Sequence, residues 1–315
     1  GGGSTIYVNK FTVAAGTFTL NKSSTSPSSD IPLGGTGVVL AKWDAKAAGE
    51  DMEIRQIAYT VSSSGAIKPT GTVKLQMDDG TVVYSIAGSS ITLGSATTVS
   101  LTTYATLTAN VAKTISLVVD ISSLSTGNPT FTGTLDITQV RRVSSNDIVD
   151  PTVNPVAGNA LTVKQGSLSV SNNSSAPAVT VVAGSATPAV LGSWNFVAGA
   201  AEGVNLTQIQ VTVPVGFGRN YKDLELWMGG VKVSADTAST ISPGVTDAAV
   251  TFTLSPQKTI AAAATAVLEL RGRALSTTTD ATQVASIAAS GVSGSLTVSL
   301  TSLASTPAVA SASYT

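Results

Sequence analysis

The chain has 315 residues, a net charge of −1, 11% charged residues, and neither Cys nor His. This charge excludes the electrostatic attraction that nucleic acids and anionic membranes require. The absence of His and Cys excludes Ser-His-Asp, Cys-His and thiolate chemistry and most zinc sites. No apolar run approaches the ~20 residues of a membrane-spanning helix. We therefore expect no enzymatic activity, no cofactor and no membrane span.

The N-terminal segment, Thr5–Leu20, reads as one extended stretch with a change of face in its middle. Tyr7, Phe11 and Val13 share one side of a strand, because side chains alternate with a period of two. The apolar residues after the break at Ala15–Gly16 have the opposite parity. We expect this break to join two strands that bury opposite faces.

Strands follow throughout the first half of the chain. In Val73–Val83, apolar and polar residues alternate up to an Asp-Asp-Gly turn, which is the pattern of a β-hairpin. Turn-forming Gly, Pro, Ser and Asn recur about every ten residues, as in β-sandwiches. Trp43 has an equivalent later, Trp194. We expect both to lie in a core, because packing positions are what a repeated module keeps.

A second copy of the N-terminal segment lies in mid-chain. "GNALTVKQGSLSVS" (Gly158–Ser171) matches "VNKFTVAAGTFTLN" (Val8–Asn21). The identical positions are Asn9 and Asn159, Thr12 and Thr162, Val13 and Val163, and Gly16 and Gly166. Leu161 and Val163 share one parity, and the parity changes at Gly166. This segment is expected to finish one module and to begin the next.

The repeat continues through the second half. "VLGSWNFVAGAAEGVNLTQIQVTV" (Val190–Val213) matches "VLAKWDAKAAGEDMEIRQIAYTV" (Val39–Val61), and Leu224–Val233 repeats the hairpin. Residues 259–270 come nearest to a helical pattern, but their partner, Ala112–Asp120, reads as a strand, so we expect strands in both.

Two further strands are expected near the end of the chain. Leu296, Val298 and Leu300 alternate with Ser and Thr. "PAVASASYT" (Pro307–Thr315) stands at the position of "PVAGNALTVK" (Pro155–Lys164), with Ala and Ser in place of large apolar residues. It is a weaker version of the last strand of a module.

These matches predict an all-β fold of two tandem Ig-like or jelly-roll-like β-sandwich modules, 16–165 and 166–315, with residues 1–15 as an extra N-terminal strand. A lone apolar strand would leave its backbone unpaired and would aggregate. We therefore expect it to add to the second module of a neighbouring copy, which is donor-strand complementation. Such a head-to-tail contact does not close, so it builds a filament. The residues expected in this contact are Ile6, Tyr7, Val8, Phe11 and Val13.

Two segments carry a family resemblance. "VVAGSATPAVLGSWNFVAGAAEGVNLTQIQV" (Val181–Val211) resembles the tandem sandwich repeats of bacterial surface and S-layer-like proteins. "FTVAAGTFTL" (Phe11–Leu20) resembles the start of donor-strand-linked extracellular fibre subunits, pilus-like polymers in which an N-terminal strand docks into the next subunit. The resemblance implies an extracellular or cell-surface location and further copies of the same chain as partners.

An alternative from another functional class is a monomeric surface or S-layer-like adhesin with tandem Ig-like binding modules. Such a protein would recognise carbohydrate or protein, and Trp227 is the candidate contact because its parity is opposite to that of Leu226 and Met228. The two hypotheses differ in whether the N-terminal strand pairs with another copy or folds back on its own chain.

The acidic residues and the glycosylation motifs give weaker signals. Glu50, Glu202 and the Asp78–Asp79 pair are expected to be solvated turn residues. Asp often fills turns because its side chain can hydrogen-bond to the nearby backbone. The loop at Asn146, Asp147 and Asp150 offers oxygen ligands of the kind calcium prefers, with ordinary loop polarity as the alternative. Glycans are candidate partners, because four residues satisfy the Asn-x-Ser/Thr pattern: Asn21, Asn172, Asn173 and Asn205.

Overall fold

The computed structural model describes residues 15–65, 67–123, 127–176, 181–235, 237–238, 247–276 and 283–311. These ranges contain 21 strands, one four-residue helix, α1 (Phe217–Asn220), and one 3-10 turn, η1 (Gly88–Ser90). The prediction of an all-β fold is confirmed. No helix in the described ranges is long and apolar enough to span a membrane.

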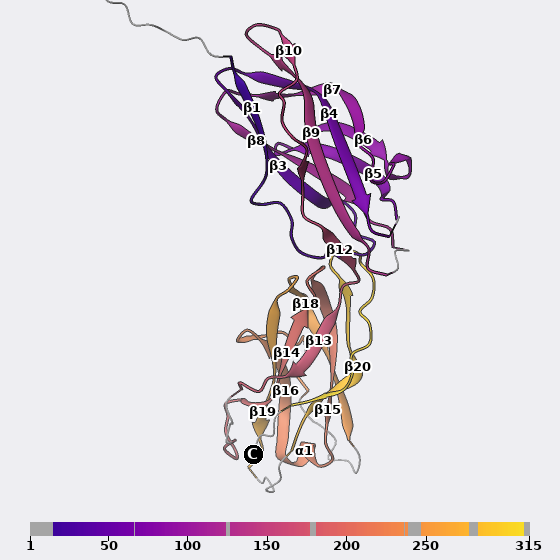
Figure 1. The fold of residues 1–315 in the computed structure, drawn as a ribbon. Coiled ribbons are helices and arrows are strands. Elements are labelled where there is room, and N and C mark those ends of the chain that lie inside the picture. The colour runs from indigo at the N-terminus through magenta and orange to yellow at the C-terminus, as the bar shows by residue number, and fades with distance from the viewer. Residues whose placement is uncertain are drawn as a thin grey trace, which may run out of the picture. The chain divides into compact units, whose positions relative to one another are not determined.

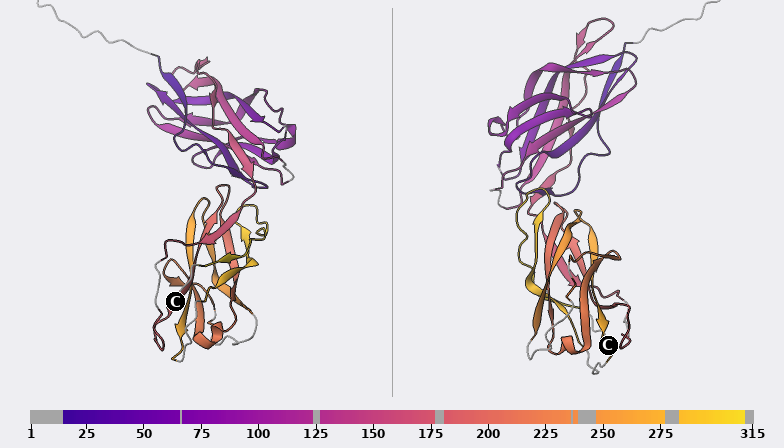
Figure 2. Two further views of the ribbon diagram at one scale, coloured as in Figure 1. Left: turned by 60° about the horizontal axis from the view of Figure 1, so that its bottom comes forward. Right: turned by 180° about the vertical axis from the view of Figure 1, so that it is seen from behind.

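The chain divides into two compact units (Figures 1 and 2). Unit 1 holds the described residues up to Ser28 together with Gly37–Thr162, and unit 2 holds Ser29–Thr36 and the residues from Val163 onward. The module limits 16–165 and 166–315 remain a prediction from the sequence repeat.

The first two sheets form a sandwich around the core of unit 1, but β2 and the last two residues of β12, although they belong to one of these sheets, fall in the residues of unit 2. One has the order β1 (Thr17–Lys22), β3 (Val38–Ala48), β8 (Ala112–Asp120), β5 (Thr70–Met77) and β6 (Val82–Ala87). The other has the order β2 (Ile31–Pro32), β12 (Leu161–Lys164), β9 (Thr130–Arg142), β4 (Met52–Ser63) and β7 (Thr97–Leu107), and β10 (Ile148–Val149) and β11 (Val156–Ala157) also pair with β9.

Unit 2 repeats this arrangement. One sheet has the order β13 (Leu168–Asn172), β14 (Ala189–Ala198), β19 (Thr265–Ala274), β16 (Tyr221–Met228) and β17 (Val231–Lys232). The other has the order β18 (Ala248–Ile260), β15 (Val204–Val213), β20 (Ser286–Leu296) and β21 (Val309–Ala310). Helix α1 lies at one end of this sandwich (Figure 1).

Each core is built from strands along which buried and more exposed side chains alternate. On β9, Phe131, Gly133, Leu135 and Ile137 are buried, while the residues that alternate with them are partly exposed. Trp43 and Trp194 are both completely buried, which confirms that the repeated tryptophans are core residues. Burial of one face of every strand, rather than of continuous runs, explains why the sequence shows alternation in nearly every segment.

One predicted strand is wrong. β20 ends at Leu296, and the next residues form a bend in which Val298 and Leu300 are 41% and 73% exposed. The cause is Glu202, whose carboxylate accepts hydrogen bonds from the backbone N–H groups of Val298 (2.8 Å) and Ser299 (2.9 Å). These contacts pull the segment out of the sheet despite its alternating sequence.

Asp136 on β9 offers a test of the fold that depends on pH. Burial raises the pKa of its carboxyl, the like charge of Asp150 adds to this, and Oδ1 has no hydrogen-bond partner among the described residues. A raised folded-state pKa means that the ionised form costs stability above the unfolded pKa of about 3.9. This cost disappears as the pH falls through the folded and then the unfolded pKa.

We therefore expect Asp136→Asn to raise the thermal midpoint at pH 7 and to lose this advantage below about pH 4. The control is Asp79→Asn, because hydrogen bonds from Thr81 lower the pKa of Asp79, so this change should not stabilise at pH 7. Thermal unfolding followed by circular dichroism at both pH values measures the effect. An equal advantage for Asp136→Asn at both pH values would contradict the assignment.

Candidate assembly interface

β12 shows how the mid-chain copy of the repeated segment lies. Leu161 and Val163 are each 1% exposed, as their shared parity predicts. Leu161 lies opposite Phe131 in an antiparallel pairing with β9, and Val163 lies opposite Ile31 in a parallel pairing with β2. This short strand therefore pairs with a strand on each side and buries two apolar side chains.

Polar contacts fix the register of the same segment. Asn159 Nδ2 donates a hydrogen bond to the Pro27 carbonyl (2.7 Å), and Asn159 Oδ1 accepts one from Lys22 Nζ (2.8 Å). Lys164 Nζ forms an ion pair with Asp30 Oδ2 at 2.8 Å. Asn159 is one of the residues that the N-terminal copy shares, as Asn9.

A buried tryptophan holds the start of the last strand in both units. Trp43 Nε1 donates to the Val156 carbonyl (2.8 Å), and Trp194 Nε1 donates to the Val309 carbonyl (3.0 Å). Two residues further on, Gly158 N donates to the Gly133 carbonyl, and Ser311 N donates to the Ala285 carbonyl. β21 therefore corresponds to β11, and Gln283 corresponds to Phe131.

In the second sandwich, the counterpart of β2 is Val181–Val182. The two segments turn alike, since Gly35 N bonds the Pro32 carbonyl and Ser185 N bonds the Val182 carbonyl, each at 3.2 Å. Ile31 and Pro32 are buried beside β12. Val181 is only partly buried and Val182 is 69% exposed, and neither pairs with a strand in the described part of the chain. Unit 2 thus has an exposed apolar edge where β12 covers its counterpart.

The break in the repeated segment has the same structure in both copies. Gly16 N donates to Glu50 Oε1 (3.3 Å), and a Cβ at Gly16 would lie 2.7 Å from Glu50 Cγ. A Cβ at Gly166 would lie 2.6 Å from Glu202 Cγ. Glycine is required at both breaks because the glutamate side chain packs directly against the backbone. The repeat of this pair indicates that the chain enters both units along the same course.

These contacts correct the expectation that the glutamates are solvated. Glu202 is 2% exposed, and besides its two backbone partners it accepts a hydrogen bond from Ser299 Oγ (2.9 Å). Glu50 forms an ion pair with Arg142 (3.5 Å) and accepts a hydrogen bond from Ser144 Oγ. The match of Glu50 with Glu202 in the internal repeat was the signal for a shared role.

The residues predicted for the donor contact, Ile6, Tyr7, Val8, Phe11 and Val13, lie outside the described residues. The repeat gives each of them a described counterpart. Phe11 and Val13 correspond to Leu161 and Val163, which are buried. Ile6, Tyr7 and Val8 correspond to Val156, Ala157 and Gly158, where Ala157 is exposed.

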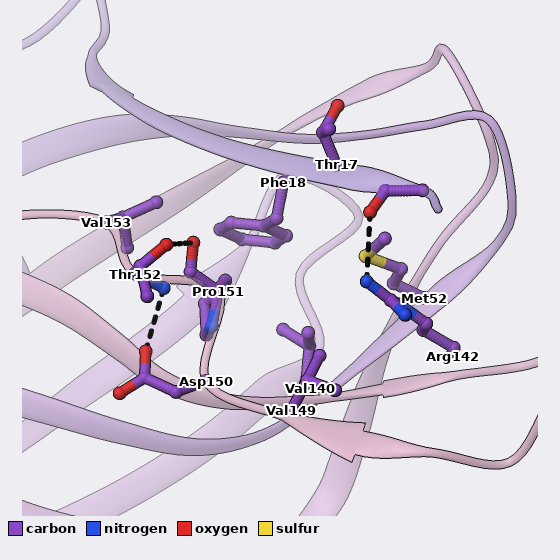
Figure 3. A pocket seen from close by; sticks show the side chains of 11 residues that line it. Thr17, Phe18, Met52, Val140, Arg142, Val149, Asp150, Pro151, Thr152 and Val153 are labelled. Atoms are coloured by element: carbon purple, nitrogen blue, oxygen red, sulfur yellow. Dashed lines mark hydrogen bonds between the residues drawn. The ribbon is translucent and has the colours of Figure 1, made fainter. Parts of the chain in front are cut away.

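A cavity of about 430 Å³ opens where residue 16 enters unit 1 (Figure 3). Its lining mixes apolar side chains with Arg142, Asp150 and two threonines, and Phe18 lies between the loop from Asp150 to Val153 on one side and Met52 and Arg142 on the other. Arg142 Nη2 donates to the Gly16 carbonyl (3.3 Å). The cavity therefore combines an apolar floor with one cation and one anion.

The loop considered for calcium is engaged in hydrogen bonds of its own. Asn146 Oδ1 accepts from Arg141 Nη1 (2.9 Å), and Asp150 Oδ1 accepts from Thr152 N (2.8 Å). Asp147 N donates to Ser145 Oγ. The described residues hold no group of three or more acidic, His or Cys side chains that could bind a metal ion. Turn hydrogen bonds therefore account for the contacts of Asn146 and Asp150.

Trp227, the candidate contact of an adhesin, is partly buried. Its Nε1 donates to Glu225 Oε2 (3.1 Å), and the guanidinium of Arg271 lies 4.4 Å from its ring centroid. Burial acts to raise the pKa of Glu225, but hydrogen bonds from Lys232, Thr237 and Trp227 hold it below its usual value. The indole edge and one ring face are thus in contact with the protein's own charged residues.

The glycosylation motifs lie on or next to strands. Asn21 on β1 and Asn172 on β13 are exposed, whereas Asn173 donates to Ser193 Oγ (3.0 Å) and Asn205 accepts from Thr259 Oγ1 (2.6 Å). Asn21 lies opposite Asp44 and Asn172 lies opposite Trp194, so the two are one residue out of step. The motif is therefore not at the same structural position in the two units.

Neither a protein-family model nor a curated protein matches this sequence. Solved structures similar to it include the C-terminal domain of the Streptococcus agalactiae AgI/II polypeptide BspA, with 10% identity, a TM-score of 0.23, and coverage of 94% of this chain and 99% of that one. The C-terminal domain of the Streptococcus pyogenes antigen I/II-family protein AspA has 8% identity, a TM-score of 0.22, and coverage of 94% and 98%.

BcpA, the major pilin subunit of Bacillus cereus, has 9% identity and a TM-score of 0.21, over 80% of this chain and 69% of that one. These neighbours are the C-terminal domains of an AgI/II polypeptide and of an antigen I/II-family protein, and a major pilin subunit. TM-scores and identities of this size do not carry function from one protein to another.

The buried carboxylate of Glu202 gives a direct test of the chain entry into unit 2. Glu202→Ala removes three hydrogen bonds to a charged acceptor and leaves two backbone donors without it, which should cost about 2–4 kcal/mol of stability. The control is Glu269→Ala, whose carboxylate pairs with Arg271 at a partly exposed site (2.6 Å), where such a pair is worth about 0–1 kcal/mol. Urea unfolding measures both. Equal, small losses would contradict a structural role for Glu202.

Proposed function

We propose that this protein is a structural, non-enzymatic subunit of an extracellular filament. Each copy would donate residues 1–15 to unit 2 of a neighbouring copy, so that copies join head to tail. The observation that carries the proposal is the exposed edge at Val181–Val182, which pairs with no strand among the described residues, whereas the edge at β2 is buried and paired. The comparisons place no function on the chain, so the argument depends on this edge and on the sequence repeat.

The uncovered edge is of the kind that strand addition uses. An unpaired segment with exposed apolar side chains is an aggregation hazard unless another strand covers it. In β-strand addition, backbone hydrogen bonds supply affinity and alternate side chains supply specificity. β12 shows this geometry within one chain, with Val163 opposite Ile31.

The N-terminal segment carries the residues that this edge would accept. Val13 and Ala14 correspond to Val163 and Lys164, and would lie beside Val181–Val182. Phe11 corresponds to Leu161, which lies opposite Phe131. It would therefore lie opposite Gln283, the counterpart of Phe131 in unit 2. Full burial of a Phe side chain contributes roughly 1.5–3 kcal/mol, so this short strand has one strong anchor.

Only part of the predicted donor strand has a free place to occupy. β21 already stands where β11 stands in unit 1, and the residues matching β11 at the N-terminus are Ile6 and Tyr7. We therefore restrict the donor contact to Phe11–Ala14. Residues 312–315 of the acceptor, which lie outside the described residues, follow β21, and Tyr314 is in sequence the counterpart of Leu161. The donor competes with this residue for the site.

Three matched substitutions test the proposal. Phe11→Asp would bury a charge in place of the apolar anchor, and loss of a buried Phe costs about 3–5 kcal/mol, so the critical concentration for assembly should rise by more than about a hundredfold. Lys10→Asp, on the opposite face, and Tyr7→Asp, at the position of exposed Ala157, should assemble nearly as the unchanged chain does. Sedimentation of polymer at several concentrations measures this.

Equal polymer yields for Phe11→Asp and Lys10→Asp would contradict face-specific donation. If the unsubstituted chain stays monomeric at concentrations well above those it reaches on the cell surface, the result would favour the adhesin alternative instead.

A further inference from the structure

We infer that the cavity at the entry of unit 1 receives the Pro214–Gly216 turn of the neighbouring copy's unit 2. The contact would be a second interface between the same two copies, beside the donated strand. This inference rests on the proposed function, because strand donation is what brings the two surfaces together. The partner is a second copy of this chain.

The first argument is position on the acceptor. Gln283, at the edge where Phe11 would lie, donates through Nε2 to the Val215 carbonyl at 3.3 Å. Val215 is 50% exposed and stands just before helix α1. Strands lie about 5 Å apart, so this turn is within roughly 10 Å of the donated strand.

The second argument is the length of the donor. Gly16 lines the cavity and follows Phe11 by five residues, which span at most about 17 Å when extended. A donor anchored at Phe11 therefore holds the cavity of its own unit 1 close to the turn at Val215 of the acceptor. The segment from Phe11 to Gly16 is the whole connection between the donated strand and this cavity.

The third argument is which apolar residues are free at this end of unit 2. The large apolar residues exposed in the described part of unit 2 are Val182, Val215, Val231, Val298 and Leu300. Val298 and Leu300 come after the end of β20, beside Glu202, and Val231 comes after the end of β16. Val215 instead lies next to α1, before the start of β16. The donated strand would cover Val182. Val215 is the exposed apolar residue that remains, and it would contact the apolar part of the cavity lining, which includes Phe18 and Val149.

The fourth argument is charge. Arg142 and Asp150 lie on opposite sides of the cavity (Figure 3). Next to the turn are Asp247, whose Oδ1 accepts from Val215 N (3.2 Å), and the exposed Arg219 of α1. Each side therefore offers one cation and one anion. Such matched pairs at the rim of an apolar contact set orientation more than affinity.

The absence of native cysteine makes a cross-linking test clean. The double variant Val149→Cys with Val215→Cys places one thiol in the cavity and one on the turn. Mild oxidation of its filaments should convert the monomer band on a non-reducing denaturing gel into dimers and longer ladders that a reductant removes. The matched control, Val82→Cys with Val215→Cys, puts the first thiol on exposed β6 and should give monomer only.

Each outcome decides a different statement. Filaments that form but give no more cross-linked product than the control overturn this inference and leave strand donation intact. Absence of filaments from the unchanged chain overturns the proposed function and this inference with it. If Val149→Cys does not fold, Thr152→Cys on the exposed rim of the same cavity replaces it, with the same expected ladder.

Discussion

The proposed assembly depends on one rule: a sheet edge that carries apolar side chains must be covered by another strand. In the first sandwich, β12 satisfies that rule by pairing with β9 and β2 and by burying Leu161 and Val163. The corresponding edge of unit 2, at Val181–Val182, pairs with no strand in the described ranges. The sequence that would fit it occurs at the other end of the chain. The proposed head-to-tail polymer depends on this one difference between two otherwise similar units.

The course of the chain into each unit depends on a glycine packed against a glutamate. Glu50 and Glu202 reach the backbone at Gly16 and Gly166, and no side chain fits in the space between. The two glutamates are stabilised differently, by an arginine and a serine in unit 1 and by two backbone amides and a serine in unit 2. The pairing of glycine and glutamate is repeated although its surroundings are not, which indicates that the entry course itself is what matters.

Much of the fold could be predicted because its physical signals are local. Alternation of apolar residues predicted the hairpin at 224–233, and the repeat predicted that both tryptophans are buried and that Leu161 and Val163 face inward. Long-range contacts could not be predicted in this way. Alternation at Leu296–Leu300 indicated a strand, but a carboxylate almost a hundred residues earlier binds that backbone instead.

The candidate interface was only partly visible in the sequence. The repeated segment pointed to residues 1–15, but it treated Tyr7 and Phe11 as equivalent, because alternation alone cannot show where a strand changes course. The structure separates their counterparts, since β11 and β12 are distinct strands and Ala157, on β11, is exposed whereas Leu161, on β12, is buried. The cavity beside Phe18 and its relation to Val215 had no local signal, because its lining comes from three distant parts of the chain.

The most direct test of the account is a mixing experiment. A full-length Phe11→Asp chain keeps its acceptor edge but cannot donate, so it should add to one end of a filament and stop growth there. Filament lengths measured by negative-stain microscopy should fall steadily as the fraction of this chain increases, while Lys10→Asp in the same proportions leaves them unchanged. Filaments of unaltered length, or Phe11→Asp copies spread along their interior, would contradict assembly by strand donation.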